Sequence, residues 1–163
     1  QSQIGLCELK RFDSWNLKNR IRNGRMLKKA LEKHPLVLHA PVDTPQRRNA
    51  YWWAPFVLDT SKLTCPIKEF IKAIAAEGVP VYSVLWPEMY KERAYLERNG
   101  FGVANYPFFD PKARNIDYSR VSCPRARWMT DRTMCFFTHP VYTEEHMQAC
   151  IDAFKKVAKA YMK

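Results

Sequence analysis

The sequence has no C-x-x-C motif, and its few cysteines are scattered. They are odd in number and stand far apart in a chain of 163 residues: Cys7, Cys65, Cys123, Cys135 and Cys150. This spacing indicates neither a zinc knuckle nor a disulfide framework. Isolated thiols usually behave as small buried apolar groups, and they suit a reducing compartment. We therefore predict no metal site and a cytoplasmic location.

Long apolar runs are missing as well. No run approaches the roughly 18 apolar residues of a membrane-spanning helix. The polar start, residues 1–4, lacks the basic-then-apolar order of a signal peptide, and there is no initiator methionine. We therefore expect a chain with no membrane partner that is either a processed product or an excised piece of a longer protein.

Motifs for nucleophilic catalysis or nucleotide binding are also absent. The sequence contains no Walker loop and no dinucleotide-binding fingerprint. A Ser/His/Asp or Cys/His nucleophile cannot be assembled, because the four histidines stand in unrelated contexts: His34, His39, His139 and His146. We predict no catalytic residue in this chain. His139 follows an apolar run, where a structural hydrogen bond is more expected than catalysis.

Acidic residues are scarce relative to basic ones. The net charge is +11, and residues 1–34 alone hold nine basic side chains against three acids. Such a surface attracts phosphates, acidic partners or nucleic acid, although a solvated helix face or one that meets an acidic partner domain explains it equally well. A basic nucleic-acid-binding module is the alternative function. It ranks lower because no RNA-binding motif is present.

Residues 2–34 contain no proline and predict one long helix. Apolar side chains recur among the basic ones with approximate helical spacing. Gly24 weakens the middle of this helix by about 1 kcal/mol relative to alanine, and Pro35 ends it, because the residue before a proline avoids the helical conformation. We assign residues 1–35 to a long basic interdomain helix. It is too long for a small domain to cover, so part of it should contact something outside this chain.

Residues 36–163 predict a small α/β domain. Apolar periodicity and end signals predict strands at 51–58, 80–86 and 133–138, and helices at 66–77 and 143–161. Pro55 places the first strand at an edge or a bulge, since proline cannot donate to a central ladder. The fold class is therefore α/β, of an α+β-like kind. It is a small, mainly antiparallel three-stranded sheet backed by helices and preceded by the long N-terminal helix.

Residues 87–131 are less regular, with a short helix expected over 88–99 and an irregular segment after it. Long irregular segments in small domains are usually functional or cover a site. The turn Trp86–Tyr90 follows a predicted strand, where α/β folds place ligand-contacting groups. Trp86 and Tyr90 offer flat faces and hydrogen-bonding tips that suit a polyhydroxylated ring. The alternative is a strand-to-helix turn with Trp86 buried.

Four segments together resemble a known family in their order and spacing: Gln3–Asp13, Arg48–Leu58, Phe70–Pro80, and Cys123-Pro124 followed by Phe136–His146. They are similar to the long helix, the first small-domain strand, the next helix and turn, and the closing motif of the DegT/StrS family of pyridoxal-phosphate-dependent sugar aminotransferases. The resemblance covers nearly all of the chain. It implies that the chain is the small, C-terminal domain of a fold-type I aminotransferase.

The resemblance also implies a chemistry for the intact enzyme. Lysine-bound pyridoxal phosphate takes an amino group from a donor such as glutamate or glutamine and passes it to a keto-sugar or keto-cyclitol. The Schiff-base lysine and the phosphate-binding residues of the family belong to a large catalytic domain, which lies outside this chain. We therefore expect no cofactor bound to this chain alone, no amino transfer by it, and a homodimer when the enzyme is intact.

The substrate-binding residues that the resemblance implies are Arg48, Tyr51, Trp86 and Tyr90, with His139 as a weaker candidate. In the intact enzyme these side chains would form one wall of the substrate pocket.

Overall fold

The computed structural model describes residues 1–84 and 88–163, and the chain folds into two compact units. The first unit combines residues 1–84 with 132–163, and the second contains residues 85–131. No helix in the described part of the chain is long and apolar enough to cross a membrane.

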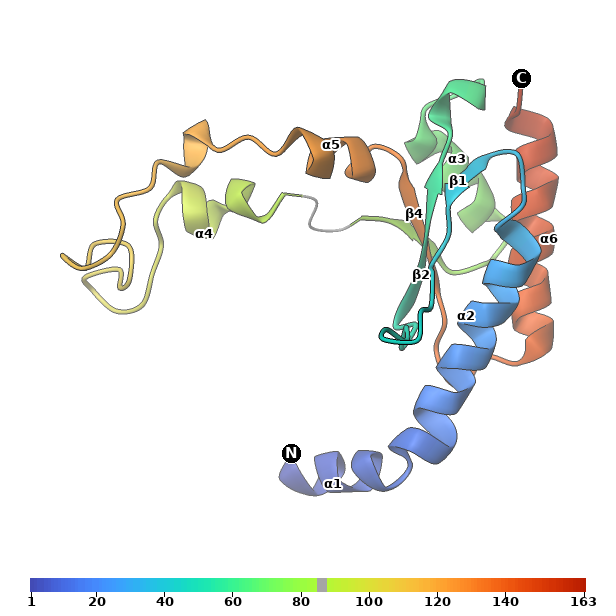
Figure 1. Ribbon diagram of the computed structural model, residues 1–163, viewed down its shortest axis with the longest axis horizontal. Coiled ribbons are helices and arrows are strands. Elements are labelled where there is room, and N and C mark those ends of the chain that lie inside the picture. The colour runs from blue at the N-terminus through green and yellow to red at the C-terminus, as the bar shows by residue number, and fades with distance from the viewer. Residues whose placement is uncertain (85–87) are drawn as a thin grey trace. The chain divides into compact units, whose positions relative to one another are not determined.

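A four-stranded antiparallel sheet forms the centre of the first unit (Figure 1). Its strands are β1 (Val37–His39), β2 (Trp53–Leu58), β3 (Val81–Ser83) and β4 (Thr133–Phe137), in the spatial order β1-β2-β4-β3. The antiparallel prediction is confirmed, but the predicted count of three strands is wrong. Strand β1 lies before residue 51, where the sequence analysis predicted no strand. It was missed because three residues that pair with Val57 and Leu58 leave no readable periodicity.

The register of β2 against β4 explains how the sheet buries one face. Ala54 pairs with Phe136 and Phe56 pairs with Met134, and all four side chains are completely buried. Neighbouring residues point to opposite faces of a strand, so the alternate positions lie on the other side of the sheet. Pro55 pairs with Cys135 of β4 at a position that β1 does not reach, which is how a proline fits this strand.

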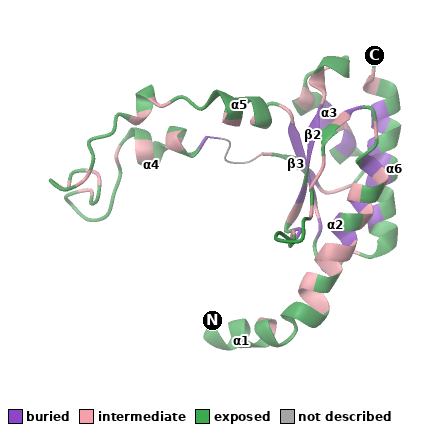
Figure 2. Cartoon of the chain, viewed as in Figure 1, coloured by how far each residue is buried: buried purple, intermediate pink, exposed green. Residues whose placement is uncertain are grey.

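Three helices cover the buried face of the sheet (Figures 1 and 2): α2 (Lys18–Leu31), α3 (Ile67–Ala76) and α6 (Glu144–Tyr161). Each lays an apolar stripe on the core, as the 3-4 spacing predicts, and α2 and α3 both pack on α6. Helix α3 ends before Gly78, whose φ of 85° suits glycine at a helix C-terminus. Thr143 caps α6 by accepting a hydrogen bond from the backbone N–H of His146.

The N-terminal helix is interrupted, which corrects the prediction of one helix over residues 2–34. Helix α1 (Ser2–Lys10) ends at Arg11, and a π-helical segment η1 (Phe12–Leu17) connects it to α2. The carbonyl oxygen of Arg11 accepts from both Trp15 N and Asn16 N, at 3.0 and 3.2 Å, so one residue is added to the turn. The extra residue shifts the phase of the apolar stripe. Helix α1 has no buried residue (Figure 2).

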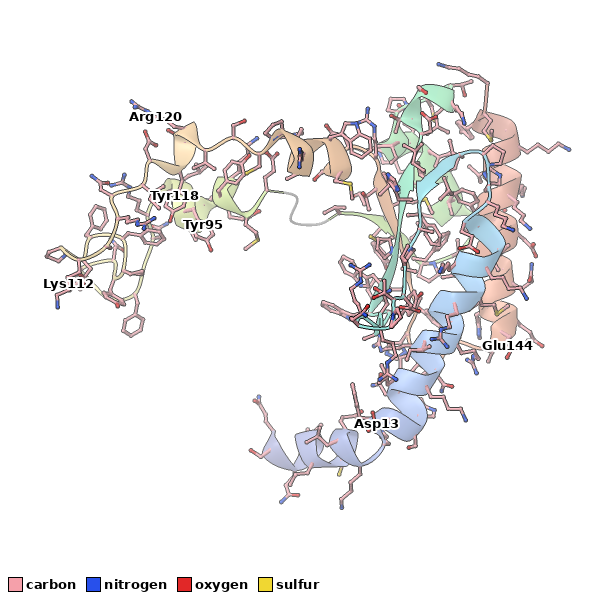
Figure 3. The ribbon with its side chains drawn as sticks, in the orientation of Figure 1. Asp13, Tyr95, Lys112, Tyr118, Arg120 and Glu144 are labelled. Atoms are coloured by element: carbon pink, nitrogen blue, oxygen red, sulfur yellow. The ribbon has the colours of Figure 1, made fainter. Side chains whose placement is uncertain are left out.

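The second unit has short elements joined by long turns: η3 (Met89–Lys91), α4 (Arg93–Leu96), η4 (Tyr118–Arg120) and α5 (Pro124–Thr130). The helix expected over 88–99 is thus a 3₁₀ turn followed by a single short helix. Tyr95 and Tyr118 lie together (Figure 3), with ring centroids 5.2 Å apart. Phe108 packs edge-on against both. This cluster of three rings takes the place of an aliphatic core.

Gly24 gives a test of the fold. Alanine has the higher helix propensity, but the packing around this position admits only glycine. A Cβ atom at this buried position would overlap the ring of Tyr51, which packs directly against the helix backbone. We expect Gly24→Ala to lower the free energy of unfolding by about 1–3 kcal/mol, as overpacking does. Gly5→Ala is the matched control, since nothing lies within 4 Å of its Cβ position. It should leave stability unchanged or raise it slightly. Urea denaturation of both variants measures these changes in stability. A Gly24→Ala protein more stable than the wild type would contradict the close packing of Tyr51 on this helix.

Candidate functional site

Three of the predicted site residues meet around one turn of α2, at residues 22–25. Arg48 lines a hollow beside this turn, and the ring of Tyr51 packs on Gly24. The carbonyl oxygen of His139 accepts a hydrogen bond from Asn23 Nδ2 at 3.1 Å. Segments far apart in the sequence therefore converge on the middle of α2.

Asn23 is the residue that organises this convergence, and the sequence analysis missed it. It is completely buried, and every polar atom of its side chain is engaged. Its Nδ2 donates to the carbonyl oxygens of His139 and Tyr142, both at 3.1 Å, and its Oδ1 accepts from Arg22 at 3.0 and 3.1 Å. The sequence did indicate that Asn23 is buried, because it lies one helical turn before the apolar Leu27. An amide on the apolar side of a helix needs partners.

Tyr51 lies in the core of the first unit. Only 3% of the residue is exposed, and its backbone is in the left-handed region with φ 51°. Its hydroxyl group has no hydrogen-bond partner within the described residues. Burial raises the pKa of the phenol, and the nearby Asp43 carboxylate raises it further. The hydroxyl group is itself enclosed in the core, and the predicted substrate contact of Tyr51 stays a prediction.

His139 has an exposed side chain at the end of β4, and its ring Nδ1 accepts from the backbone N–H of Val141 at 3.4 Å. Together with the bond from Asn23 to its carbonyl oxygen, this contact holds the turn that leads into α6. These are structural hydrogen bonds, which the sequence analysis expected at His139 in preference to catalysis. The exposed imidazole stays a predicted weak substrate contact.

The sheet carries a row of aromatic rings on the face opposite the helices. Trp52 stacks on Trp53 with ring centroids 5.4 Å apart, Trp53 lies 5.6 Å from Phe137, and Phe137 lies 5.0 Å from Tyr82. Trp52 is 65% exposed and Tyr82 is 42% exposed. The indole Nε1 of Trp53 is buried without a partner in the described part of the chain. This aromatic row offers flat faces, which suit the apolar faces of a sugar ring.

The second unit holds Tyr90, whose hydroxyl group is already engaged. It donates to the carboxylate of Glu88 and accepts from the backbone N–H of Cys123 at 3.2 Å. Glu88 is buried and also binds Lys91 and Arg127. The hydrogen bond from Tyr90 is the main reason that the pKa of Glu88 lies below its ordinary value, with Lys91 and Arg127 adding to it.

This Glu88 cluster joins two stretches of the second unit that are more than thirty residues apart. A role of Tyr90 in substrate binding stays a prediction, as no ligand contact is needed to explain its position. Trp86, the other predicted residue of this turn, lies outside the described residues.

A basic hollow of about 370 Å³ lies beside η1 and the first half of α2. It is lined by Asp13, Leu17, Lys18, Ile21, Arg22, Arg25 and Arg48, and Figure 3 labels Asp13. Four cations and a single carboxylate therefore share one small surface. Of the predicted site residues, the structure places Arg48 here. The other six were not predicted, although the basic excess of residues 1–34 pointed to this stretch.

Metal binding finds no support in this arrangement. Within residues 1–84 and 88–163, no cluster of three or more His, Cys, Asp or Glu side chains could hold a metal ion.

The whole chain is similar in fold to part of several solved aminotransferases. No protein-family model matches it, and no curated protein matches it in sequence. It matches an aminotransferase from Psychrobacter cryohalolentis with a TM-score of 0.72 and 22% identity, over 96% of this chain and 37% of that one. For the sugar aminotransferase CalS13 from Micromonospora echinospora the TM-score is 0.62, the identity 18%, and the coverage 94% and 33%.

A third similar structure is Helicobacter pylori PseC, an aminotransferase involved in the biosynthesis of pseudoaminic acid. Its TM-score is 0.69 and its identity 14%, over 96% of this chain and 36% of that one. The chain thus spans about one third of the length of these enzymes. At these identities the likeness establishes the fold. The predicted likeness in fold to a part of a sugar aminotransferase is confirmed.

The Glu88 cluster predicts how the second unit responds to acid. The unfolded chain has an ordinary glutamate pKa of about 4.3, and the folded pKa is lower. The carboxylate therefore contributes stability that is fully present above the unfolded value and is lost as the pH falls through the folded value. We expect the protection factor of the Cys123 amide against hydrogen exchange to decrease in that range. Glu88→Gln should lower this protection already at neutral pH.

Glu97→Gln is the matched control for this experiment, because Glu97 pairs only with Arg93 and Asn99 on the surface. It should leave Cys123 protection unchanged. Equal exchange in the wild type and Glu88→Gln at neutral pH would show that the cluster does not hold the unit together.

Proposed function

We propose that this chain is the C-terminal domain of a pyridoxal-phosphate-dependent aminotransferase of the DegT/StrS type, acting on a keto-sugar or keto-cyclitol. The observation that carries the proposal is the match in fold over 96% of the chain to about a third of such enzymes. A domain that corresponds to one third of an enzyme needs the remainder to complete the site. The missing partner in this proposal is the large catalytic domain.

The lysines of this chain do not fit the cofactor. A lysine that forms a Schiff base is activated by desolvation or by neighbouring charge in an enclosed site. Here none of the 14 lysines in the sequence is buried, and those in ion pairs lie at the surface with Asp or Glu. The cofactor would therefore be held by the large domain, and no step of the chemistry is assigned to a residue of this chain.

This domain would contribute binding and packing. The aromatic row of Trp52, Trp53, Phe137 and Tyr82 would provide flat faces for the sugar, and Arg48, Tyr51, Tyr90 and His139 are proposed as further contacts. Helix α1 would pack on the large domain through Leu6 and Leu9, which stand three residues apart on one helix face and are 53 and 70% exposed. An apolar helix face with nothing on it is otherwise costly in water.

We also propose that the intact enzyme is a cytoplasmic homodimer that takes its amino group from glutamate or glutamine. The nucleic-acid-binding module is the less favoured function, because the similar structures described above are aminotransferases.

The complete reading frame that contains this chain provides the test. We expect the purified full-length protein to show the visible absorbance of bound pyridoxal phosphate and to transfer an amino group from glutamate to a keto-sugar. The chain alone should do neither. A complete protein without a lysine-bearing large domain, or one that transfers no amino group to any keto-sugar, would overturn the proposal.

In the full-length enzyme, Trp52→Ala tests whether the aromatic row faces the sugar. Losing one stacking contact should raise the KM for the amino acceptor roughly tenfold, while the half-reaction with the amino donor stays nearly unchanged. Trp52→Phe keeps a flat ring and should restore most of the loss. If both half-reactions fall together, the row does not contact the acceptor.

A further inference from the structure

The basic hollow concentrates positive charge beyond what the chain itself neutralises. Lys18 and Arg48 have no carboxylate within ion-pair distance in the described part of the chain. Arg25 forms an ion pair with Asp43 at 3.7 Å, but that carboxylate already accepts from the backbone and side chain of Asn49 at 2.8 and 2.7 Å. Cations crowded together without counter-charge raise the local potential and attract an anion.

One of the four cations, Arg22, is also held in place before any ligand arrives. Arg22 is fixed by Asn23 Oδ1 and by the carbonyl oxygen of Tyr142, at 2.7 Å, and these bonds use its Nε and one terminal nitrogen. The other terminal nitrogen has no partner in the described part of the chain. A guanidinium group that is already oriented loses little freedom when it binds an oxyanion.

The walls of the hollow strengthen such an interaction. Leu17 and Ile21 line it between the cations, and apolar walls reduce screening by water. Leu17 ends the π-helical segment η1, and π-turns in helices are frequent at functional sites. A volume of about 370 Å³ is large enough for a phosphate group with a few attached atoms, given roughly 30 Å³ for one water molecule.

We propose that this hollow binds the phosphate group of a small phosphate monoester. A dianion matches the four cations better than a single carboxylate does. Arg25 and Arg48 can each offer paired N–H donors to its oxygens, and Arg22 can donate from its remaining terminal nitrogen. Asp13 lines the same hollow and would accept a hydrogen bond from a hydroxyl group of the ligand. Nucleic acid fits less well, since it needs a charged groove that continues along a strand.

Isothermal titration calorimetry on the 163-residue chain tests the site, with inorganic phosphate and glycerol 3-phosphate as probes. Both should bind in a saturable manner with one site, and glycerol 3-phosphate should bind more tightly if Asp13 receives a hydroxyl group. Equal affinities would assign the site to free phosphate, which overturns the monoester proposal. No saturable binding of either probe overturns the site itself.

Matched variants distinguish binding at this hollow from attraction by the net positive charge of the chain. Arg48→Gln should weaken binding roughly tenfold, the effect of losing one charge-assisted hydrogen bond. Arg47→Gln removes the same charge from the neighbouring residue, whose guanidinium group donates to the carbonyl oxygen of Val42 outside the hollow. It should change binding by less than about twofold. Asp13→Asn should tighten the binding of inorganic phosphate, which a merely structural role would not do.

Two further outcomes would overturn the proposal. Equal losses in Arg47→Gln and Arg48→Gln would show that only net charge matters. Tight binding of a mixed-sequence oligonucleotide that neither phosphate probe displaces, with a steep dependence on salt, would assign the surface to nucleic acid. These measurements need neither cofactor nor amino transfer, so the anion site and the aminotransferase proposal can fail separately.

Discussion

The first unit depends on one buried amide. Asn23 sits on the apolar side of α2 with no exposure to solvent, where an unpaired amide would cost about 1–3 kcal/mol. Its hydrogen bonds satisfy that demand only when the turn from His139 to Tyr142 lies against the helix. The same contact orients Arg22, and the neighbouring Gly24 admits the ring of Tyr51. The positions of α2, of the turn before α6, of the chain entering β2 and of the basic hollow therefore all depend on the contacts around Asn23.

Much of this fold could be predicted from the sequence, because its strongest elements repeat a simple pattern. Helix α6 shows regular apolar spacing and a Thr143 cap, and β2 and β4 are dense in aromatic and branched side chains. Strand β1 and the π-helical segment were missed for a physical reason. Each depends on a tertiary pairing or a single shifted hydrogen bond, and neither changes the local composition.

The candidate site was harder to predict than the fold. Arg48 was found, but the cations around it come from a helix whose phase is set by the added residue at Arg11. The aromatic row was overlooked because Trp53, Tyr82 and Phe137 sit on β2, β3 and β4, and only the strand register brings these three rings together. Resemblance to a family indicated which segments to inspect. It could not show that Tyr51 turns inward or that the Tyr90 hydroxyl group is occupied.

The second unit, unlike the first, has almost no buried side chains in its described part. Among its described residues Glu88 alone is buried, so its order comes from ion pairs, turns and three aromatic rings in contact. Substitutions and changes of length in residues 88–131 therefore remove little hydrophobic free energy, in contrast to any change at Phe56 or Phe154. Over evolutionary time such a segment can diverge quickly while the sheet of the first unit stays constant. A lineage that needs to recognise a new molecule can alter this region first, at low risk to folding.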